Sequence, residues 1–504
     1  MAEGIGSVLM SWVQSQSSTT LLFMVVICGF ITLLVKDYVI PYRTILATGL
    51  KGPIPKPFIG NVFDYGGVCQ HRGQLKRQEK YGKIYTLLHY HIPTVYIGDP
   101  EIIKTIMVKE FSNFTNRFPV NKAHHPFDKT VVRADDDDWK RLRTLLIPSF
   151  SASKLKTNVP FINNFTNDVI DKFLQAEHQG KSVDVWKIFG NLSMSTIIAT
   201  VFGIEFKSKK HKEKVITAAS ALLRNQTNLL QLVLIYAYLA LALWEPITGG
   251  KIITSVYYLR DTIVGVIQER RKNLKRGIPC RRDILQHMIE AGDRDRLSNE
   301  EIVSQAIIFL VAGYETTAST LAFLCYTLAV NPDVQQKLIH EIDSKCPDEE
   351  TLNYETVLDL PYLEMVVNET LRLYSPAFFI TRQAKRDINV HEVFIPKNSM
   401  VVFPIYAVHH NPELWPDADK FIPERFSSEK KARRHPYSYI PFGGGPRICI
   451  GMKLALLEVK LALVKILHRV EFVTCKETKI PLKLRTGSTA SPESSVYLKT
   501  RRRH

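Results

Sequence analysis

Residues 442–451 (FGGGPRICIG) restrict the fold and chemistry of this chain more than any other stretch. They hold one cysteine, Cys449, in a loop with three consecutive glycines, and Arg447 stands two residues before it. Glycine tolerates positive φ and lets the backbone approach a flat partner closely. The apolar run after Gly451 predicts a helix, and N–H groups at its start would stabilise a thiolate. A cation beside that thiolate could hold a carboxylate.

These features predict that Cys449 is the axial ligand of a haem iron and that Arg447 holds a haem propionate. The alternative is structural, a buried cysteine after a glycine-rich turn. Phe442, Gly445, Arg447, Cys449 and Gly451 match the haem-binding signature of the cytochrome P450 superfamily, so the chain resembles the haem-thiolate monooxygenases. The resemblance implies haem b at this loop, with Phe442 and Gly445 among the residues that bind it.

The composition is that of a large folded protein in a reducing compartment. The chain has 504 residues, of which 45% are hydrophobic, enough for a large core. Its seven cysteines are an odd number, lie far apart and include no Cys-x-x-Cys pair. This pattern argues against a disulfide framework and against a zinc site.

Residues 21–35 (LLFMVVICGFITLLV) carry no charge and, with their neighbours, approach the length that spans a membrane. Only Glu3 is charged before this run, whereas Lys36 and Arg43 follow it, so a cleaved signal peptide is disfavoured. The same bias predicts that the rest of the chain stays cytoplasmic. With the resemblance, this gives a single-pass protein of the endoplasmic reticulum membrane. The expected parts are a luminal N-terminus at 1–20, a transmembrane anchor at 21–40, a proline-rich hinge at 41–57 and a haem-thiolate catalytic domain at 58–504.

A long apolar helix is predicted after the capping box at residues 298–301, and it carries AGYETT at residues 312–317. A glutamate and a threonine inside such a helix are unfavourable unless both are hydrogen-bonded. Structurally, Thr316 can bond back to a carbonyl one turn earlier. The resemblance assigns a function instead, because this stretch matches the oxygen-activation segment of the family. There Gly313 leaves space for dioxygen, and Thr316 with Glu315 relays protons to it.

Four further residues are assigned to the haem by the resemblance alone. Trp139 and Arg143 lie four apart, on one face of the helix predicted after the aspartates at 135–138. That spacing by itself is common. In the family this pair meets the haem propionates, and Arg117 and Arg382 match two further propionate-binding arginines.

Glu369 and Arg372 lie one helical turn apart as an i,i+3 pair, a weak pattern on its own. Arg425, in the sequence PERF, stands where the family completes a Glu369–Arg372–Arg425 network under the haem loop. The implied role is structural, because a buried carboxylate needs paired donors.

The formal net charge of +17 suits docking of an acidic electron donor. The resemblance places Lys140, Arg141, Lys453 and Lys460 on one face with the haem loop. It also implies an NADPH-dependent flavoprotein reductase as partner, with cytochrome b5 as a second candidate. Membrane lipid is another expected partner. No nucleic-acid recognition motif is present, so no nucleic-acid partner is expected.

Two other segments carry expectations. Residues 229–244 are almost wholly apolar, and they are either a buried helix or a patch that dips into the membrane near the substrate entrance. The basic end at residues 501–504 is expected to be frayed.

The resemblance covers roughly residues 50–490 and implies a mainly α fold, the haem-thiolate prism with a small β region, preceded by one N-terminal transmembrane helix. AGYETT, WKRLR and FGGGPRICIG are most similar to the steroid- and drug-oxidising branch that includes thromboxane synthase. The predicted function is NADPH- and reductase-dependent insertion of one oxygen atom into a lipophilic steroid, fatty acid or xenobiotic. One alternative is an isomerase or synthase that rearranges a lipid peroxide without external electrons, which the intact Thr316 disfavours. The other is a non-catalytic haem carrier or sensor.

Overall fold

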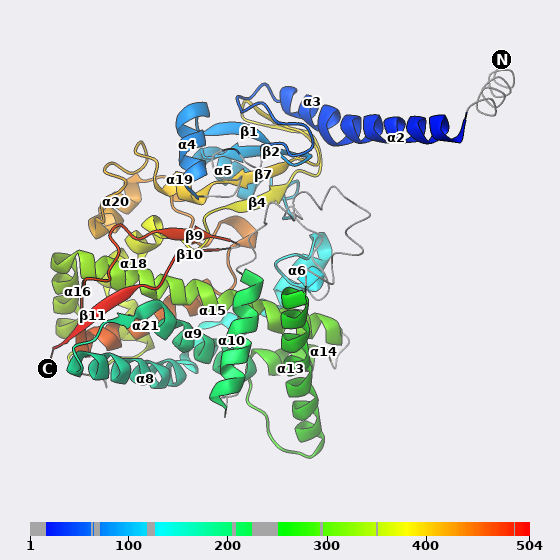
Figure 1. Ribbon diagram of the computed structural model, residues 1–504. Helices are drawn as coiled ribbons and strands as arrows, with labels where there is room; N and C mark the ends of the chain where they lie inside the picture. The colour runs from blue at the N-terminus through cyan, green and yellow to red at the C-terminus, as the bar shows by residue number, and fades with distance from the viewer. Residues whose placement is uncertain are drawn as a thin grey trace. The chain divides into compact units, whose positions relative to one another are not determined.

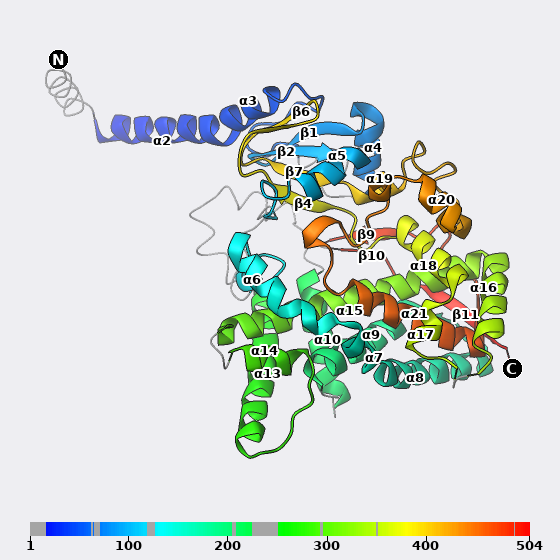
Figure 2. The same ribbon diagram turned by 180° about the vertical axis from the view of Figure 1, so that it is seen from behind.

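The computed structural model describes residues 17–61, 64, 71–117, 127–203, 208–223, 250–292, 296–348, 351–487 and 489–503. The chain divides into two compact units (Figures 1 and 2). Unit 1 comprises Met1–Ile97 and Ala384–Val402, and unit 2 comprises Gly98–Gln383 and Phe403–His504. The apolar segment at residues 229–244 lies outside the described residues, so both interpretations of it stay open.

Unit 1 begins with an exposed apolar helix. α2 (Ser18–Leu34) continues through a π-helical turn (Val35–Val39) into α3 (Ile40–Leu46). The described residues contain three helices that are long and apolar enough to cross a membrane. In α9 (Val185–Phe202) and α15 (Asn299–Val330), 72% and 78% of the apolar stretch is buried, whereas none is buried in residues 18–46. The helix at the N-terminus is therefore the one that fits a membrane span, as predicted.

The remainder of unit 1 is a small β region. β1 (Ile84–His89) and β2 (Ile92–Ile97) form an antiparallel hairpin, and β7 (Met400–Phe403) pairs with β2 in parallel. β5 (Ile388–Val390) and β6 (Val393–Ile395) form a second hairpin. Helices α3 and α4 (His71–Tyr81) pack against β1.

Unit 2 is mainly helical, and α15 is its central element. Helices α9, α13, α14, α18 and α21 all pack against α15, which can be followed through the middle of this unit in Figures 1 and 2. The predicted capping box at its start is confirmed, because Ser298 and Glu301 satisfy each other's backbone N–H groups. The other helices are α5 (Pro100–Lys104), α6 (Asp136–Leu146), α7 (Ala152–Lys156), α8 (Val159–His178), α10 (Lys209–Leu223), α13 (Gly250–Lys275), α14 (Ile284–Gly292), α16 (Pro332–Lys345), α17 (Tyr354–Leu358), α18 (Pro361–Leu373), α19 (Ile405–His409), α20 (Ser428–Arg433) and α21 (Met452–Arg469).

The strands of unit 2 include Arg501 and Arg502, so the expectation of a frayed basic end is wrong for the described residues of that end. β11 (Tyr497–Arg502) lies between β3 (Val183–Asp184) and β8 (Val470–Val473) and is antiparallel to both. Arg503 donates through Nη2 to Asp343 Oδ2 at 2.6 Å, so strand pairing and an ion pair hold the basic end. β9 (Leu484–Thr486) pairs with β10 (Ala490–Pro492), and β4 spans Ile380–Gln383.

Candidate active site

The loop that carries Cys449 closes on itself and on a neighbouring backbone. The N–H of Cys449 donates to the carbonyl of Phe442 at 2.9 Å. Gly445 has a φ of +65°, and a Cβ there would lie 2.0 Å from the carbonyl oxygen of Met107. Glycine is therefore required at this position by the protein backbone itself, both for its positive φ and for the close approach to Met107.

His409 supports the Cys449 loop, and no pattern in the sequence indicated this role. The N–H of Ile440, just before the glycines, donates to His409 Nε2 at 3.0 Å, and Tyr439 stacks on the ring. Burial lowers the pKa of His409 well below its usual value, consistent with a neutral ring that accepts this bond. The His409 carbonyl accepts from Arg372 Nη1 at 2.8 Å, so the loop is tied directly to the Glu369 network.

Glu369, Arg372 and Arg425 are brought together in that network. Arg372 donates to both carboxylate oxygens of Glu369 at 2.8 Å, and Arg425 Nε donates to one of them at 3.2 Å. The backbone N–H of Ile422 supplies a fourth bond at 2.9 Å. The side chains of Glu369 and Arg372 are 0% exposed. A carboxylate this deeply buried is stable only with such a full set of donors.

Three arginines near the Cys449 loop hold buried N–H groups that find no acceptor among the described residues. These are Nε of Arg117, Arg382 and Arg447, and also Nη1 of Arg447. Burial and the neighbouring charges of Arg117 and Arg447 lower the pKa of Arg382. Burial and then the charge of Arg117 lower the pKa of Arg447 to about 9. Like charges and unpaired donors gathered in this way fit an anionic partner, and the two propionates of haem b are such a partner.

Trp139 and Arg143 of α6 lie beside the same loop. The guanidinium of Arg447 lies 4.5 Å from the centre of the Trp139 ring, and that of Arg143 lies 6.0 Å from it. Arg143 also donates through Nη2 to the carbonyl of Ile448, next to Cys449, at 2.8 Å. All the residues assigned to the haem by resemblance thus belong to unit 2 and surround one loop.

The thiol of Cys449 is accessible although protein surrounds it. Its side chain is exposed to water, yet burial raises the pKa of the thiol. The N–H groups of Gly451 and Met452 and the charges of Arg117 and Arg143 act in the opposite direction. Such donors and cations favour a thiolate once a metal replaces the proton.

One face of α15 is accessible in the middle of an otherwise buried helix. From residue 302 to residue 329, every residue is buried except Ile308, Ala312, Gly313 and Thr316. Ile308, Ala312 and Thr316 are spaced by four and share one face, which we call the α15 stripe. The Thr316 hydroxyl donates to the carbonyl of Ala312 at 2.6 Å, the back-bonding that the structural interpretation predicted.

Two residues of this helix make contacts that the resemblance did not imply. A Cβ on Gly313 would lie 2.6 Å from Cδ1 of Ile197, so this glycine also lets α9 pack against α15. Glu315 does not share the stripe with Thr316. Its side chain is 4% exposed and pairs with Arg485 Nη2 of β9 at 3.0 Å. Arg485 lies 170 residues from Glu315 in the sequence, and no local pattern predicts this partner.

The basic face is smaller than expected. Lys140 and Lys453 are exposed, but Lys460 is 4% exposed and ion-paired with Glu364. Arg141 pairs with Asp138 and with Glu301.

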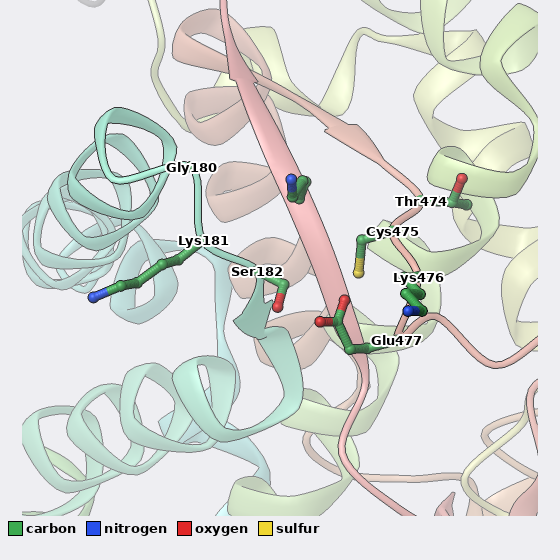
Figure 3. A pocket seen from close by; sticks show the side chains of 8 residues that line it. Gly180, Lys181, Ser182, Thr474, Cys475, Lys476 and Glu477 are labelled. Carbon is green, nitrogen blue, oxygen red and sulfur yellow. The ribbon is translucent and has the colours of Figure 1, made fainter.

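Another cysteine, Cys475, lines a surface pocket of about 480 Å³ (Figure 3). The lining includes Lys181, Glu477 and Lys499 but none of the residues around Cys449. In the described residues no group of three or more histidine, cysteine or acidic side chains could hold a metal ion. A haem iron needs only one axial protein ligand, so a lone cysteine suffices for it.

The comparison with known families decides between the interpretations. The model of the family "Cytochrome P450" matches residues 50–500. The chain belongs to the cytochrome P450 family. Similar proteins include cytochrome P450 3A6 of Oryctolagus cuniculus, 40% identical over 462 residues that cover 90% of this chain and 91% of that protein. Cytochrome P450 3A7 of Homo sapiens is 38% identical over 475 residues, which cover 90% and 92%.

Family membership confirms the predicted fold class and the predicted chemistry. The chain is a haem-thiolate monooxygenase with haem b as its cofactor, and its electrons come from NADPH through a reductase. The chemistry that haem b supplies when bound is the activation of dioxygen. The accessible thiol, the unpaired arginine donors and the α15 stripe all fit this group.

Proposed function

We propose that this P450 is a single-pass enzyme of the endoplasmic reticulum membrane that oxidises a lipophilic compound with electrons from an NADPH-dependent flavoprotein reductase. The observation that carries the proposal is the accessible Cys449 thiol with arginines around it. The Cys449 loop belongs to the same unit as the α15 stripe. The intact Thr316 disfavours the rearrangement of a lipid peroxide, which needs no external electrons. NADPH consumption by the holoenzyme and a reductase, stimulated by a lipophilic compound, tests the proposal.

Each residue around the loop has a role in this proposal. Cys449 ligates the iron, while Phe442 and Gly445 shape the loop that presents the sulfur. The propionates bind to the unpaired donors and their neighbours, namely Arg117, Trp139, Arg143, Arg382 and Arg447. Glu369, Arg372 and Arg425 hold the loop from below through His409.

Thr316 is the residue proposed to pass protons, because its hydroxyl lies on the accessible stripe. Glu315 supports it from the next position, held by Arg485. The Thr316 oxygen can accept a hydrogen bond from water, and to pass a proton on the hydroxyl releases its own hydrogen from the Ala312 carbonyl while its oxygen takes one from that water.

Replacing Thr316 with alanine is expected to uncouple the enzyme. NADPH oxidation should continue while hydrogen peroxide rises and organic product falls, by up to about 100-fold, the lower end for acid-base groups because water can partly replace the hydroxyl. Thr316→Ser should restore most of the product. Thr320→Ala is the matched control, because Thr320 makes the same back-bond one turn later, to the Thr316 carbonyl at 2.8 Å, but is buried. Equal product per NADPH in Thr316→Ala and wild type would remove the proton-relay role.

The membrane arrangement follows the expected division of the chain. We propose a luminal end at residues 1–20, an anchor at 21–40, a hinge at 41–57 and a cytoplasmic catalytic part at 58–504. The exposed apolar helix supports the anchor, since none of its apolar stretch is buried by the rest of the protein. Lys140 and Lys453 remain as exposed cations that suit a reductase or cytochrome b5.

Removal of residues 1–36 should release the protein from membranes without unfolding it. The cut leaves α3 in place, because its Pro41 and Ile45 are buried and the helix packs against β1 and β2. The shortened protein is expected in the supernatant after a salt or alkaline wash, whereas the full chain stays in the pellet. Its reduced spectrum with carbon monoxide reports that the haem site is intact. Retention of the shortened protein in the alkaline pellet would indicate a second membrane segment, for which residues 229–244 are the candidate.

A further inference from the structure

Arg133 lies in a short segment that the site holds at both ends. On one side of it, the N–H of Val131 donates to Oε1 of Gln305 on α15 at 2.7 Å. On the other side, the carbonyl of Ala134 accepts from Nη2 of Arg447 at 2.6 Å. Arg133 therefore lies between a contact to α15 and a contact to the Cys449 loop. Each of these contacts is made within two residues of Arg133.

Gln305, which makes the contact on α15, lies on the same helix face as the α15 stripe. Gln305, Ile308, Ala312 and Thr316 are separated by three, four and four residues, so they share one face of the helix. Gln305 precedes Ala312 by seven residues, which is about 10 Å along the helix axis. The segment with Arg133 thus lies at the N-terminal end of the accessible stripe, about 10 Å along it from Ala312.

Among the described residues, no acceptor pairs with the guanidinium of Arg133. In the ranges that the structure describes, it makes no side-chain hydrogen bond and no carboxylate lies within 4 Å of it. It is half-buried, and burial lowers its pKa although Asp135 opposes that effect. The charge of Arg133 in turn contributes to the lowered pKa of Arg117. A half-buried cation beside another cation is stabilised by an anion.

A haem propionate could be that anion, but other residues are better placed for it. Arg117, Arg382 and Arg447 each present fully buried N–H groups without acceptors, whereas Arg133 has none that is both fully buried and unpaired. Arg133 is only half-buried, and its segment is anchored to Gln305 at the N-terminal end of the accessible stripe. It is therefore placed to meet a molecule that lies along the stripe.

We propose that Arg133 binds the carboxylate of the substrate, so that the site takes elongated lipophilic carboxylic acids. This inference rests on the proposed monooxygenase function and names its substrate class. A planar guanidinium can donate two parallel N–H groups to a carboxylate. The apolar chain of the acid would then run along Ile308 and Ala312 toward Thr316, which places a carbon far from the carboxylate beside Thr316.

Spectral titration of the holoenzyme tests the proposal without depending on turnover. Dodecanoic acid, dodecan-1-ol and methyl dodecanoate share one chain length, and only the acid carries a charge. Wild type should bind the acid more tightly than the alcohol or the ester. Arg133→Gln should weaken the acid about tenfold to a hundredfold and leave the other two within about twofold, since hydrogen bonds to charged groups have this magnitude. Arg133→Lys should retain part of the preference for the acid, because lysine keeps the positive charge but lacks the two parallel N–H donors of the guanidinium.

Arg141→Gln is the matched control, because it removes a nearby exposed arginine that already pairs with Asp138 and Glu301. It should leave all three affinities unchanged. An equal loss of acid and alcohol binding in Arg133→Gln, an unchanged affinity for the acid, or no preference for the acid in wild type would overturn the proposal. Loss of haem from Arg133→Gln, measured as haem per protein, would assign Arg133 to a propionate instead. If Arg133→Gln has no effect while Thr316→Ala still uncouples NADPH oxidation, only the substrate class fails and the monooxygenase function stands.

Discussion

Replacing Glu369 with alanine is expected to lower the free energy of unfolding by about 3–5 kcal/mol, because it leaves buried charges without a partner. Arg372 is 0% exposed, and two of its nitrogen atoms donate to Glu369. Arg425 and the N–H of Ile422 lose the same acceptor. Since Arg372 also donates to His409, which supports the Cys449 loop, the variant should bind haem poorly as well.

Denaturant unfolding and haem content per protein measure the two effects. Glu429→Ala is the matched control, because Glu429 also pairs with an arginine, Arg433, at 2.9 Å, but both side chains are more than 70% exposed. Exposed pairs of this kind contribute about 0–1 kcal/mol. If Glu369→Ala unfolds at the same denaturant concentration as this control and keeps its haem, the network is not what holds the loop.

Local patterns in the sequence predicted the elements that local physics decides. The capping box at Ser298 and the exposed apolar helix at the N-terminus each depend on residues that are close together in the sequence. The resemblance placed the haem residues in one region because the family conserves the order of its signature sequences along the chain. Between residues 386 and 404 a turn with φ of 51° at His391 separates β5 from β6.

Contacts between distant parts of the chain could not be predicted in this way. Arg485 meets Glu315, His409 accepts from Ile440, and Gln305 anchors the segment that carries Arg133. Each pair depends on how helices, strands and loops pack, and no spacing rule links its two members. The same reason explains Gly313, whose missing side chain is needed by Ile197 of another helix.

Cys449→Ser is expected to abolish both thiolate ligation and NADPH-dependent product. A serine hydroxyl keeps the size of the side chain nearly constant but has no accessible anionic form, so it cannot donate electron density to the iron as a thiolate does. The arginines and Trp139 are unchanged, which means that the variant can still bind some haem and can be compared with wild type by spectroscopy. Cys475→Ser is the matched control, because Cys475 is also accessible but lines a pocket formed by other residues.

The carbon monoxide difference spectrum of the reduced protein tests most directly whether the Cys449 thiolate holds the iron. Wild type and Cys475→Ser should both show the long-wavelength Soret band that marks a haem-thiolate, and Cys449→Ser should lack it at equal haem content. Persistence of that band in Cys449→Ser would mean that another residue ligates the iron and would contradict the account of the site.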